Sequence, residues 1–341
     1  MHPKNKNSIP LENLLDEKYI TKLFNANLKK NYPEFIRIDK LQILIIKERL
    51  GDDFEHVVAN YSFLMARVIG KEKKYLRLNI FCSAHSDGSR KKIMEILKFV
   101  NRNNISSQKA LFYDNKTQAM FYEGVRGQNL YYYIQHQADI KRYVKEVAIK
   151  LASLHKLKID PKLKISKFRS SLWSLDPSNV LGDKEIKLEN CKIEIIKLLN
   201  YIKVEFKKLK IEDNQKFFIH GDFHPENIII EEDTKIINII DFTDVRVSDF
   251  AQDIGSFLQQ FRFMSLRFYP DRKIEYYQNI FLKNYFKNRN IEMNQDIENR
   301  MLFFQAWLSL RSAVFFLRSQ NAEVKVNFLI QQSKEFLDQI K

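Results

Sequence analysis

The fold of this chain is decided by HGDFHPENIIIEEDTKIINIIDFTD, residues 220–244. Two apolar, β-branched runs, 217–219 and 228–230, flank the first half of this stretch, and a third run at 236–240 ends on Asp241. Short runs of this kind, separated by polar turns, are typical of β-strands. We therefore expect a small hairpin that holds the polar residues of the stretch rigidly at one end.

Three polar residues in this stretch have the spacing that phosphoryl transfer requires. Asp222 and Asn227 form the pattern H-x-D-x-x-x-x-N, and Asp241 follows fourteen residues after Asn227. Kinases place a catalytic loop and a metal-binding segment at this spacing. The reaction needs a carboxylate for the attacking hydroxyl and hard oxygen ligands for Mg²⁺. Asp222 can provide the first, and Asn227 and Asp241 the second; His224 and Asp244 are neighbours without an assigned role.

Several segments carry a resemblance to a known family. The sequence HGDFHPENII followed by IIDFTD resembles the signature of aminoglycoside phosphotransferases, choline kinases and related small-molecule kinases. Similar segments are LASLH (151–155), FYEGVRGQNL (121–130) and DFAQDIGSFL (249–258). The resemblance implies an α+β, bilobal protein kinase-like fold with a small β-rich N-lobe and a larger, mainly helical C-lobe. It also implies a phosphotransferase that moves the γ-phosphoryl group of ATP or GTP to a hydroxyl or amine of a small molecule, with Mg²⁺ as cofactor.

The same resemblance implies roles for individual residues. Asp222 would be the catalytic carboxylate. Asn227 and Asp241 would hold Mg²⁺ and, through it, the nucleotide. His220 would support the loop from a buried position, and Asp253 would be structural.

The N-terminal third is expected to form the nucleotide-binding lobe, residues 1–122. Residues 11–30 predict a short amphipathic helix, and residues 90–100 predict a second helix from apolar residues at helical spacing. Strands are expected in between and after, at 41–46, 57–69, 75–80 and 119–122. Two glycines in EGVRGQ mark a hinge at 123–128.

Residues 129–341 are expected to form the catalytic and acceptor-binding lobe. The apolar residues of 139–155 and 188–209 recur every three or four positions, which predicts two long helices. The segment 249–340 is helical in pattern and rich in aromatic side chains. We expect those aromatic side chains, Phe303, Trp307, Phe315 and Phe316, to be core.

The residues expected to grip the nucleotide depart from the family pattern. The chain contains no G-x-G-x-x-G, and the phosphate-covering hairpin expected near residues 52–61 has no glycine. Arg77 stands where a strand lysine is expected, and Glu95 on the following helix would be its partner. Both are equally well explained as solvated surface charges. Glu123 begins the hinge, where backbone groups meet the nucleotide base in the family.

The composition limits the classes of protein that the chain can represent. With 57 Lys and Arg against 42 Asp and Glu, the net charge of +15 favours encounter with anions. The two cysteines show no C-x-x-C spacing, which argues against a disulfide framework and against a structural zinc site. No apolar run approaches the roughly 20 residues that span a bilayer. We therefore expect a soluble, cytoplasmic protein.

Two other functions need to be weighed. A protein kinase is not expected, because it would carry D-F-G and A-P-E, whereas this chain has D-F-T-D and no A-P-E. A pseudokinase could use the positive charge to bind an acidic partner or RNA. Nucleic acid is not an expected partner, because no RNP-type or helix-turn-helix motif accompanies the charge. The oligomeric state is not encoded in any of these patterns.

The acceptor is also left open. Asp253 and the acidic residues within 271–298 could receive a cationic acceptor, and they are equally well explained as solvated charges. An anionic sugar could instead be received by arginines near the predicted cleft segments, namely Arg126, Arg246, Arg262 and Arg267.

Overall fold

The computed structural model describes residues 11–49, 55–166, 188–214, 216–317, 319 and 322–341. The chain divides into two compact units. The first contains Met1–Arg126 and Asn238–Ile240, and the second contains Gly127–Ile237 and Asp241–Lys341. The first unit is the small β-rich lobe and the second is the larger helical lobe, so the expected α+β organisation is confirmed.

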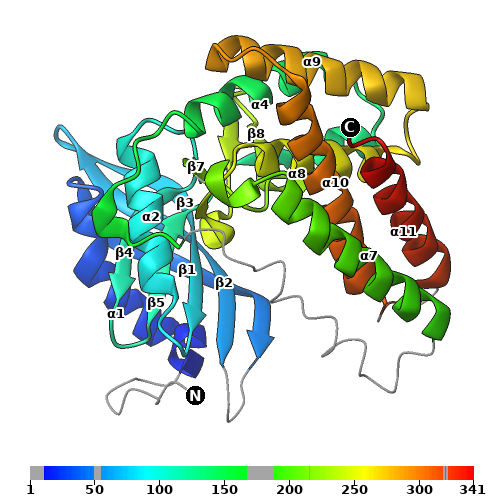
Figure 1. Cartoon of the computed structure of the whole chain (residues 1–341). Helices are drawn as coiled ribbons and strands as arrows, with labels where there is room; N and C mark the ends of the chain where they lie inside the picture. The colour runs from blue at the N-terminus through cyan, green and yellow to red at the C-terminus, as the bar shows by residue number, and fades with distance from the viewer. Residues whose placement is uncertain (1–10, 50–54, 167–187, 215, 318, 320–321) are drawn as a thin grey trace. The chain divides into compact units, whose positions relative to one another are not determined.

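The first unit is built on a five-stranded antiparallel sheet with strand order β1-β2-β3-β5-β4 (Figure 1). Its strands are β1 (Phe35–Arg49), β2 (His56–Ile69), β3 (Glu72–His85), β4 (Lys109–Asp114) and β5 (Ala119–Glu123). Helix α1 (Glu17–Asn27) precedes the sheet and follows a 3₁₀ turn at Leu11–Leu15. The side chain of Asp16 caps α1 by accepting a hydrogen bond from the backbone N–H of Tyr19.

One face of this sheet packs on α1 around Phe24. The Phe24 ring lies 5.3 Å from the Tyr61 ring and 5.7 Å from the Phe121 ring, both in edge-to-face geometry. The Tyr61 hydroxyl donates to the backbone oxygen of Leu14 at 2.8 Å, which ties the N-terminal 3₁₀ turn to the same core. Because side chains alternate along a strand, the buried Leu78 directs the neighbouring Arg77 to the opposite face.

Helix α2 (Arg90–Arg102) packs against β4 and β5 through Met94, Leu97 and their apolar neighbours. The loop that follows α2 accepts a hydrogen bond at the backbone oxygen of Ser106 from the backbone N–H of Ile239, at 3.0 Å. This bond accounts for the inclusion of residues 238–240 in the first unit, although the chain on either side of them belongs to the second.

The second unit is mainly helical (Figure 1). Its helices are α3 (Leu130–Gln135), α4 (Lys141–Leu154), α7 (Glu189–Lys208), α8 (Ala251–Ser265), α9 (Asp271–Arg289), α10 (Gln295–Phe316) and α11 (Ala322–Asp338). Helix α8 is buried along most of its length, and Phe257 stacks on Phe281 of α9 with 4.2 Å between ring centroids. Helix α10 packs against both α8 and α11. This packing fixes the N-terminus of α8 in the interior.

Short strands lie between these helices. Strand β7 (Phe217–Ile219) pairs with β10 (Arg246–Ser248), and β6 (Gly127–Asn129) pairs with β8 (Ile228–Glu231). After β8 the chain turns back into β9 (Ile237–Ile239), with a hydrogen bond from the N–H of Glu231 to the oxygen of Ile236 at 2.9 Å. The expected strands around the motif are thus present, whereas β4, β6 and β10 were not predicted.

One expectation for the aromatic residues of α10 was wrong. Phe303 and Trp307 are buried, as expected, but Phe315 is 77% exposed and Phe316 is only partly buried. These two residues occupy the end of α10, where the described part of the chain does not cover them fully.

Among the described helices, none is long and apolar enough to cross a membrane.

Candidate functional site

The loop after β7 is held in a conformation that requires glycine at position 221. Gly221 has φ +85°, a value that L side chains rarely adopt. A Cβ built on it would lie 2.1 Å from the backbone oxygen of Asp244. The loop therefore lies directly against the segment that follows Asp241, and the two halves of the motif are brought together by backbone contact.

Asp253 fixes the base of this loop from the first turn of α8. Its fully buried carboxylate accepts hydrogen bonds from the backbone N–H groups of His220 at 2.7 Å and Gly221 at 2.8 Å. It also lies 3.0 Å from Nε2 of His155. Both carboxylate oxygens are thus engaged. The earlier expectation that Asp253 can receive a cationic acceptor was wrong, because the side chain has no exposed surface.

In the pair formed by Asp253 and His155, the carboxylate is charged and the imidazole is neutral. Burial would raise the pKa of Asp253, but the hydrogen bond from His155, the nearby His220 and the N–H of Gly221 hold the pKa below its ordinary value. Burial lowers the pKa of His155 in spite of Asp253. A neutral His155 can donate from Nε2 to Asp253 and accept at Nδ1 from the Tyr285 hydroxyl at 2.7 Å. The loop therefore rests on an ionised carboxylate inside the unit.

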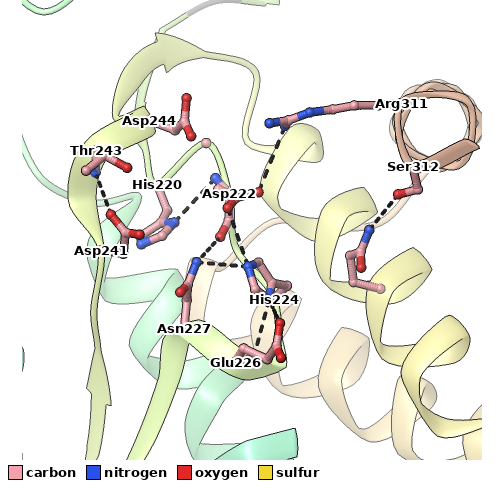
Figure 2. Close-up of polar contacts among 12 residues, drawn as sticks. His220, Asp222, His224, Glu226, Asn227, Asp241, Thr243, Asp244, Arg311 and Ser312 are labelled. Carbon is pink, nitrogen blue, oxygen red and sulfur yellow. Dashed lines mark hydrogen bonds and ion pairs between the residues drawn. The ribbon is translucent and has the colours of Figure 1, made fainter. Parts of the chain in front are cut away.

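Asp222 projects from this loop among positive and imidazole groups (Figure 2). Its Oδ2 lies 3.4 Å from Nε2 of His224, and its Oδ1 lies 3.9 Å from a terminal nitrogen of Arg311. The side chain is 35% exposed. Burial would raise the pKa of Asp222, but His224, Arg311 and His220 together hold it below its ordinary value. Asp222 is therefore a carboxylate at neutral pH and remains accessible from solvent.

Arg311 was missed by sequence reasoning. It belongs to α10, far along the chain from the motif, and no spacing or residue pattern connects it with Asp222. Packing of α10 against α8 brings it to the loop. A second arginine, Arg246, donates to the backbone oxygen of Asp244 at 2.9 Å and pairs with its carboxylate at 3.0 Å. Arg246 therefore supports the segment on which Gly221 rests.

Asn227 and Asp241 offer oxygen atoms on the same side of the motif (Figure 2). Asn227 is largely buried, and its Nδ2 donates to the backbone oxygen of Asp222 at 2.9 Å, so Oδ1 is the atom of this amide that could bind a metal ion. Asp241 is exposed and takes the left-handed conformation at φ 62°, with its side chain accepting from the N–H of Thr243 at 3.3 Å. Non-glycine residues rarely adopt that conformation, and those that do are concentrated at functional sites.

These two residues fit a hydrated Mg²⁺ ion. Mg²⁺ prefers one or two protein oxygens and completes an octahedral shell with phosphate oxygens and water. An amide oxygen and a carboxylate satisfy that preference. In the described ranges no cluster of three or more His, Cys, Asp or Glu side chains is arranged to hold a metal ion.

The residues expected to grip the nucleotide lie in the first unit and are less organised. Arg77 on β3 and Glu95 on α2 are both exposed, and no ion pair joins them in the part of the chain that the structure describes. Glu123 accepts a hydrogen bond from the Tyr32 hydroxyl at 2.6 Å and lies 3.6 Å from the ammonium group of Lys109. Its carboxylate therefore has partners within the unit. Residues 52–54 of the expected phosphate hairpin lie outside the described residues.

Comparisons with known proteins identify a family and a fold. A family model described as the phosphotransferase enzyme family matches residues 54–285, more than half of the chain. The comparison with curated proteins found no match.

Solved structures show the fold that this chain shares. A choline kinase from Cryptosporidium parvum is 14% identical, with a TM-score of 0.65 over 95% of this chain and 97% of that chain. An ethanolamine kinase from Plasmodium vivax is 15% identical, with a TM-score of 0.59 over 94% of this chain and 87% of that chain. An amicoumacin kinase in complex with AMP-PNP and Ca²⁺ is 13% identical, with a TM-score of 0.58 over 95% and 93%. The protein kinase-like fold is confirmed by these likenesses.

Proposed function

The chain belongs to the phosphotransferase enzyme family, and on that premise we propose that it transfers the γ-phosphoryl group of ATP or GTP to a small molecule. The observation that carries the proposal is the arrangement of Asp222, Asn227 and Asp241 around one loop whose base is fixed by Asp253. The acceptor group is a hydroxyl or an amine. Nucleotide binding is assigned to residues 1–122, and catalysis and acceptor binding to 129–341, with 123–128 as the connection.

Asp222 acts on the acceptor. Its carboxylate orients the acceptor hydroxyl and takes its proton as a bond forms between the hydroxyl oxygen and the γ-phosphorus. The bond from the γ-phosphorus to the bridging oxygen of the β-phosphate breaks, and its electron pair leaves with the nucleoside diphosphate. A low pKa makes Asp222 a weak base, which suits a transfer in which the proton moves late and positioning dominates.

The neighbours of Asp222 fix the direction of its carboxylate. His224 stands at Oδ2 and Arg311 at Oδ1, so both oxygens have a partner on a different element of the fold. Asn227 and Asp241 would hold Mg²⁺, which neutralises phosphate charge when it is bound. Asn227 also fixes the loop itself, because its amide donates to the backbone of Asp222. The metal ligand and the catalytic carboxylate are thereby placed by the same hydrogen bond.

Arg77, Glu95 and Glu123 are proposed to serve the nucleotide. An arginine can grip phosphate oxygens with two nitrogens, and Arg77 lies on the sheet face that the α1 core leaves free. Glu95 would orient Arg77 once phosphate is present. The backbone at Glu123 would meet the base, since its carboxylate already contacts Tyr32 and Lys109.

The test is calorimetric binding of ATP and GTP with and without Mg²⁺. The wild type should bind one or both nucleotides only when Mg²⁺ is present. Asp241→Ala should weaken that binding by roughly 100-fold, the loss expected when a metal site is disrupted. Asp233→Ala is the matched control, because Asp233 is an exposed carboxylate in the turn between β8 and β9. No binding by the wild type, or equal losses in the two variants, would contradict the proposal.

A further inference from the structure

A pocket of about 430 Å³ lies in the second unit beside the catalytic loop. Its walls come from α3, the loop, and the adjoining ends of α8, α10 and α11. Six of the lining residues carry the argument that follows: Glu226, Phe263, Arg267, Phe316, Lys325 and Phe328. All of them belong to the same unit as Asp222.

The pocket adjoins the catalytic carboxylate through His224. Oε2 of Glu226, in the pocket wall, lies 3.9 Å from Nδ1 of His224. Nε2 of the same imidazole lies 3.4 Å from Oδ2 of Asp222. One imidazole ring therefore separates the pocket wall from the group proposed to act on the acceptor (Figure 2). The pocket wall and Asp222 therefore contact the same side chain, His224.

One wall of the pocket is aromatic. The Phe263 ring lies 5.8 Å from Phe316 and 6.3 Å from Phe328. Phe328 is 41% exposed, and Phe316, which the sequence predicts to be core, is only partly buried. Ligand pockets in proteins are lined mainly by such apolar and aromatic side chains, with a few polar groups that fix orientation. The wall suits a ligand with a flat or branched apolar body.

The charges of the pocket favour an anion. Among the lining residues Glu226 is the one acidic side chain, against the two basic side chains of Arg267 and Lys325. The ammonium group of Lys325 lies 5.2 Å from the centre of the Phe316 ring. A cation of the protein therefore already occupies that face of the ring. Arg267 is exposed and forms no ion pair with any residue that the structure describes. A cationic ligand would meet two like charges here.

We propose that this pocket binds the acceptor, and that the acceptor combines an aromatic or branched apolar body with an anionic group. The assignment to an acceptor rests on the phosphotransferase function proposed above. The apolar body packs on Phe263, Phe316 and Phe328. The anionic group pairs with Arg267, which can bind a carboxylate or phosphate with two nitrogens, and with Lys325. Of the two acceptor classes left open by the sequence, the pocket selects the anionic one and adds an apolar body to it.

The first test measures binding alone, with 8-anilinonaphthalene-1-sulfonate, an aromatic anion whose fluorescence rises in apolar surroundings. Arg267→Glu and Lys325→Glu should each weaken its binding by roughly fivefold, the upper range for one exposed charge contact. Lys283→Glu, an exposed reversal in the middle of α9, is the matched control and should leave the affinity unchanged. Equal weakening in all three variants would show attraction to net charge alone and would overturn the proposal.

Competition then defines the class of ligand. Phenyllactate carries a hydroxyl, an aromatic body and a carboxylate, and it should displace the dye from the wild type and much less from Arg267→Glu. Choline should not displace it. Displacement by choline, or by phenyllactate to the same extent in both proteins, would contradict the assignment.

Calorimetry with Mg²⁺ and ATP on the same variants separates the two hypotheses. If ATP binds normally while the affinity for the dye is the same in Arg267→Glu as in the wild type, only the pocket assignment fails. If the dye behaves as expected and ATP does not bind, the phosphotransferase function fails, and with it the assignment of the pocket to an acceptor.

Discussion

The loop of the second unit and the nucleotide-gripping residues of the first unit were expected from the same resemblance, yet they differ in how they are held. Asp222 and Asn227 lie on a loop that is anchored by hydrogen bonds to Asp253 and by close backbone contact at Gly221. Arg77 and Glu95 are exposed on a strand and a helix and do not pair with each other in the described part of the chain.

The difference indicates which part of the site is organised before substrates bind. Pre-organised groups act on the reaction without paying for reorientation, whereas exposed long side chains lose conformational entropy when they bind. Catalysis should therefore depend strongly on single residues of the loop. Nucleotide affinity should depend weakly on single residues of the first unit.

The largest effect is expected for Asp222→Asn. Loss of a group that orients and deprotonates the acceptor should lower kcat by about 10³-fold, the middle of the range for general base catalysis. The affinity for ATP with Mg²⁺ should stay within about twofold, because Asn227 and Asp241 are retained and Asn keeps the shape of Asp. A coupled assay of nucleoside diphosphate release gives the first value and calorimetry the second. Parallel losses of turnover and affinity would abolish the distinction between the two regions.

An intermediate effect is expected for Asp253→Asn, measured as the free energy of unfolding in urea. Removing a buried charge that accepts two backbone N–H groups and faces His155 should cost about 3 kcal/mol. Asp233→Asn, on the exposed turn, should cost less than about 0.5 kcal/mol.

The stabilisation by Asp253 should also depend on pH. Because its folded-state pKa lies below the unfolded value of about 4, the stabilisation is complete above that value and is lost as the pH falls through the folded-state pKa. The difference between wild type and Asp253→Asn should therefore shrink in acid. A constant difference from pH 7 to pH 3 would show that the anchor does not depend on charge.

The smallest effect is expected for Arg77→Ala. Loss of one charged hydrogen-bonding partner of the phosphates should weaken ATP binding by about tenfold. Arg37→Ala on β1, another exposed arginine of the same sheet, is the control and should bind ATP as the wild type does. If the two variants bind equally well, Arg77 is a surface charge and the first unit grips the nucleotide by other means.

Sequence patterns predicted the features whose signals are local and strong. The helices expected at 139–155 and 188–209 are α4 and α7 with ends shifted by one or two residues, because many apolar positions repeat at helical spacing. The motif between β7 and β9 was predicted because its residues are adjacent in the chain. Strands β6 and β10 were missed, since three residues carry little periodicity and their pairing partners are distant.

Contacts between distant segments could not be predicted. The position of Arg311 beside Asp222 follows from the packing of α10, which no residue pattern reveals. Phe315 is exposed and Phe316 is partly buried because α10 ends there, so Phe316, which the sequence predicts to be core, contributes instead to a pocket wall. Of these features, the partly buried Phe316 is one from which the chemistry of the acceptor is inferred.

The central claim is that Asp222 and its loop transfer phosphate to a small molecule. The most direct test follows the ³¹P NMR spectrum of MgATP with catalytic amounts of protein and a mixture of hydroxylated small molecules that includes phenyllactate. The wild type should produce a new phosphomonoester signal that grows in step with ADP, and Asp222→Asn should produce none in the same time. If inorganic phosphate alone accompanies ADP, or if both proteins form the ester at the same rate, the claim is wrong.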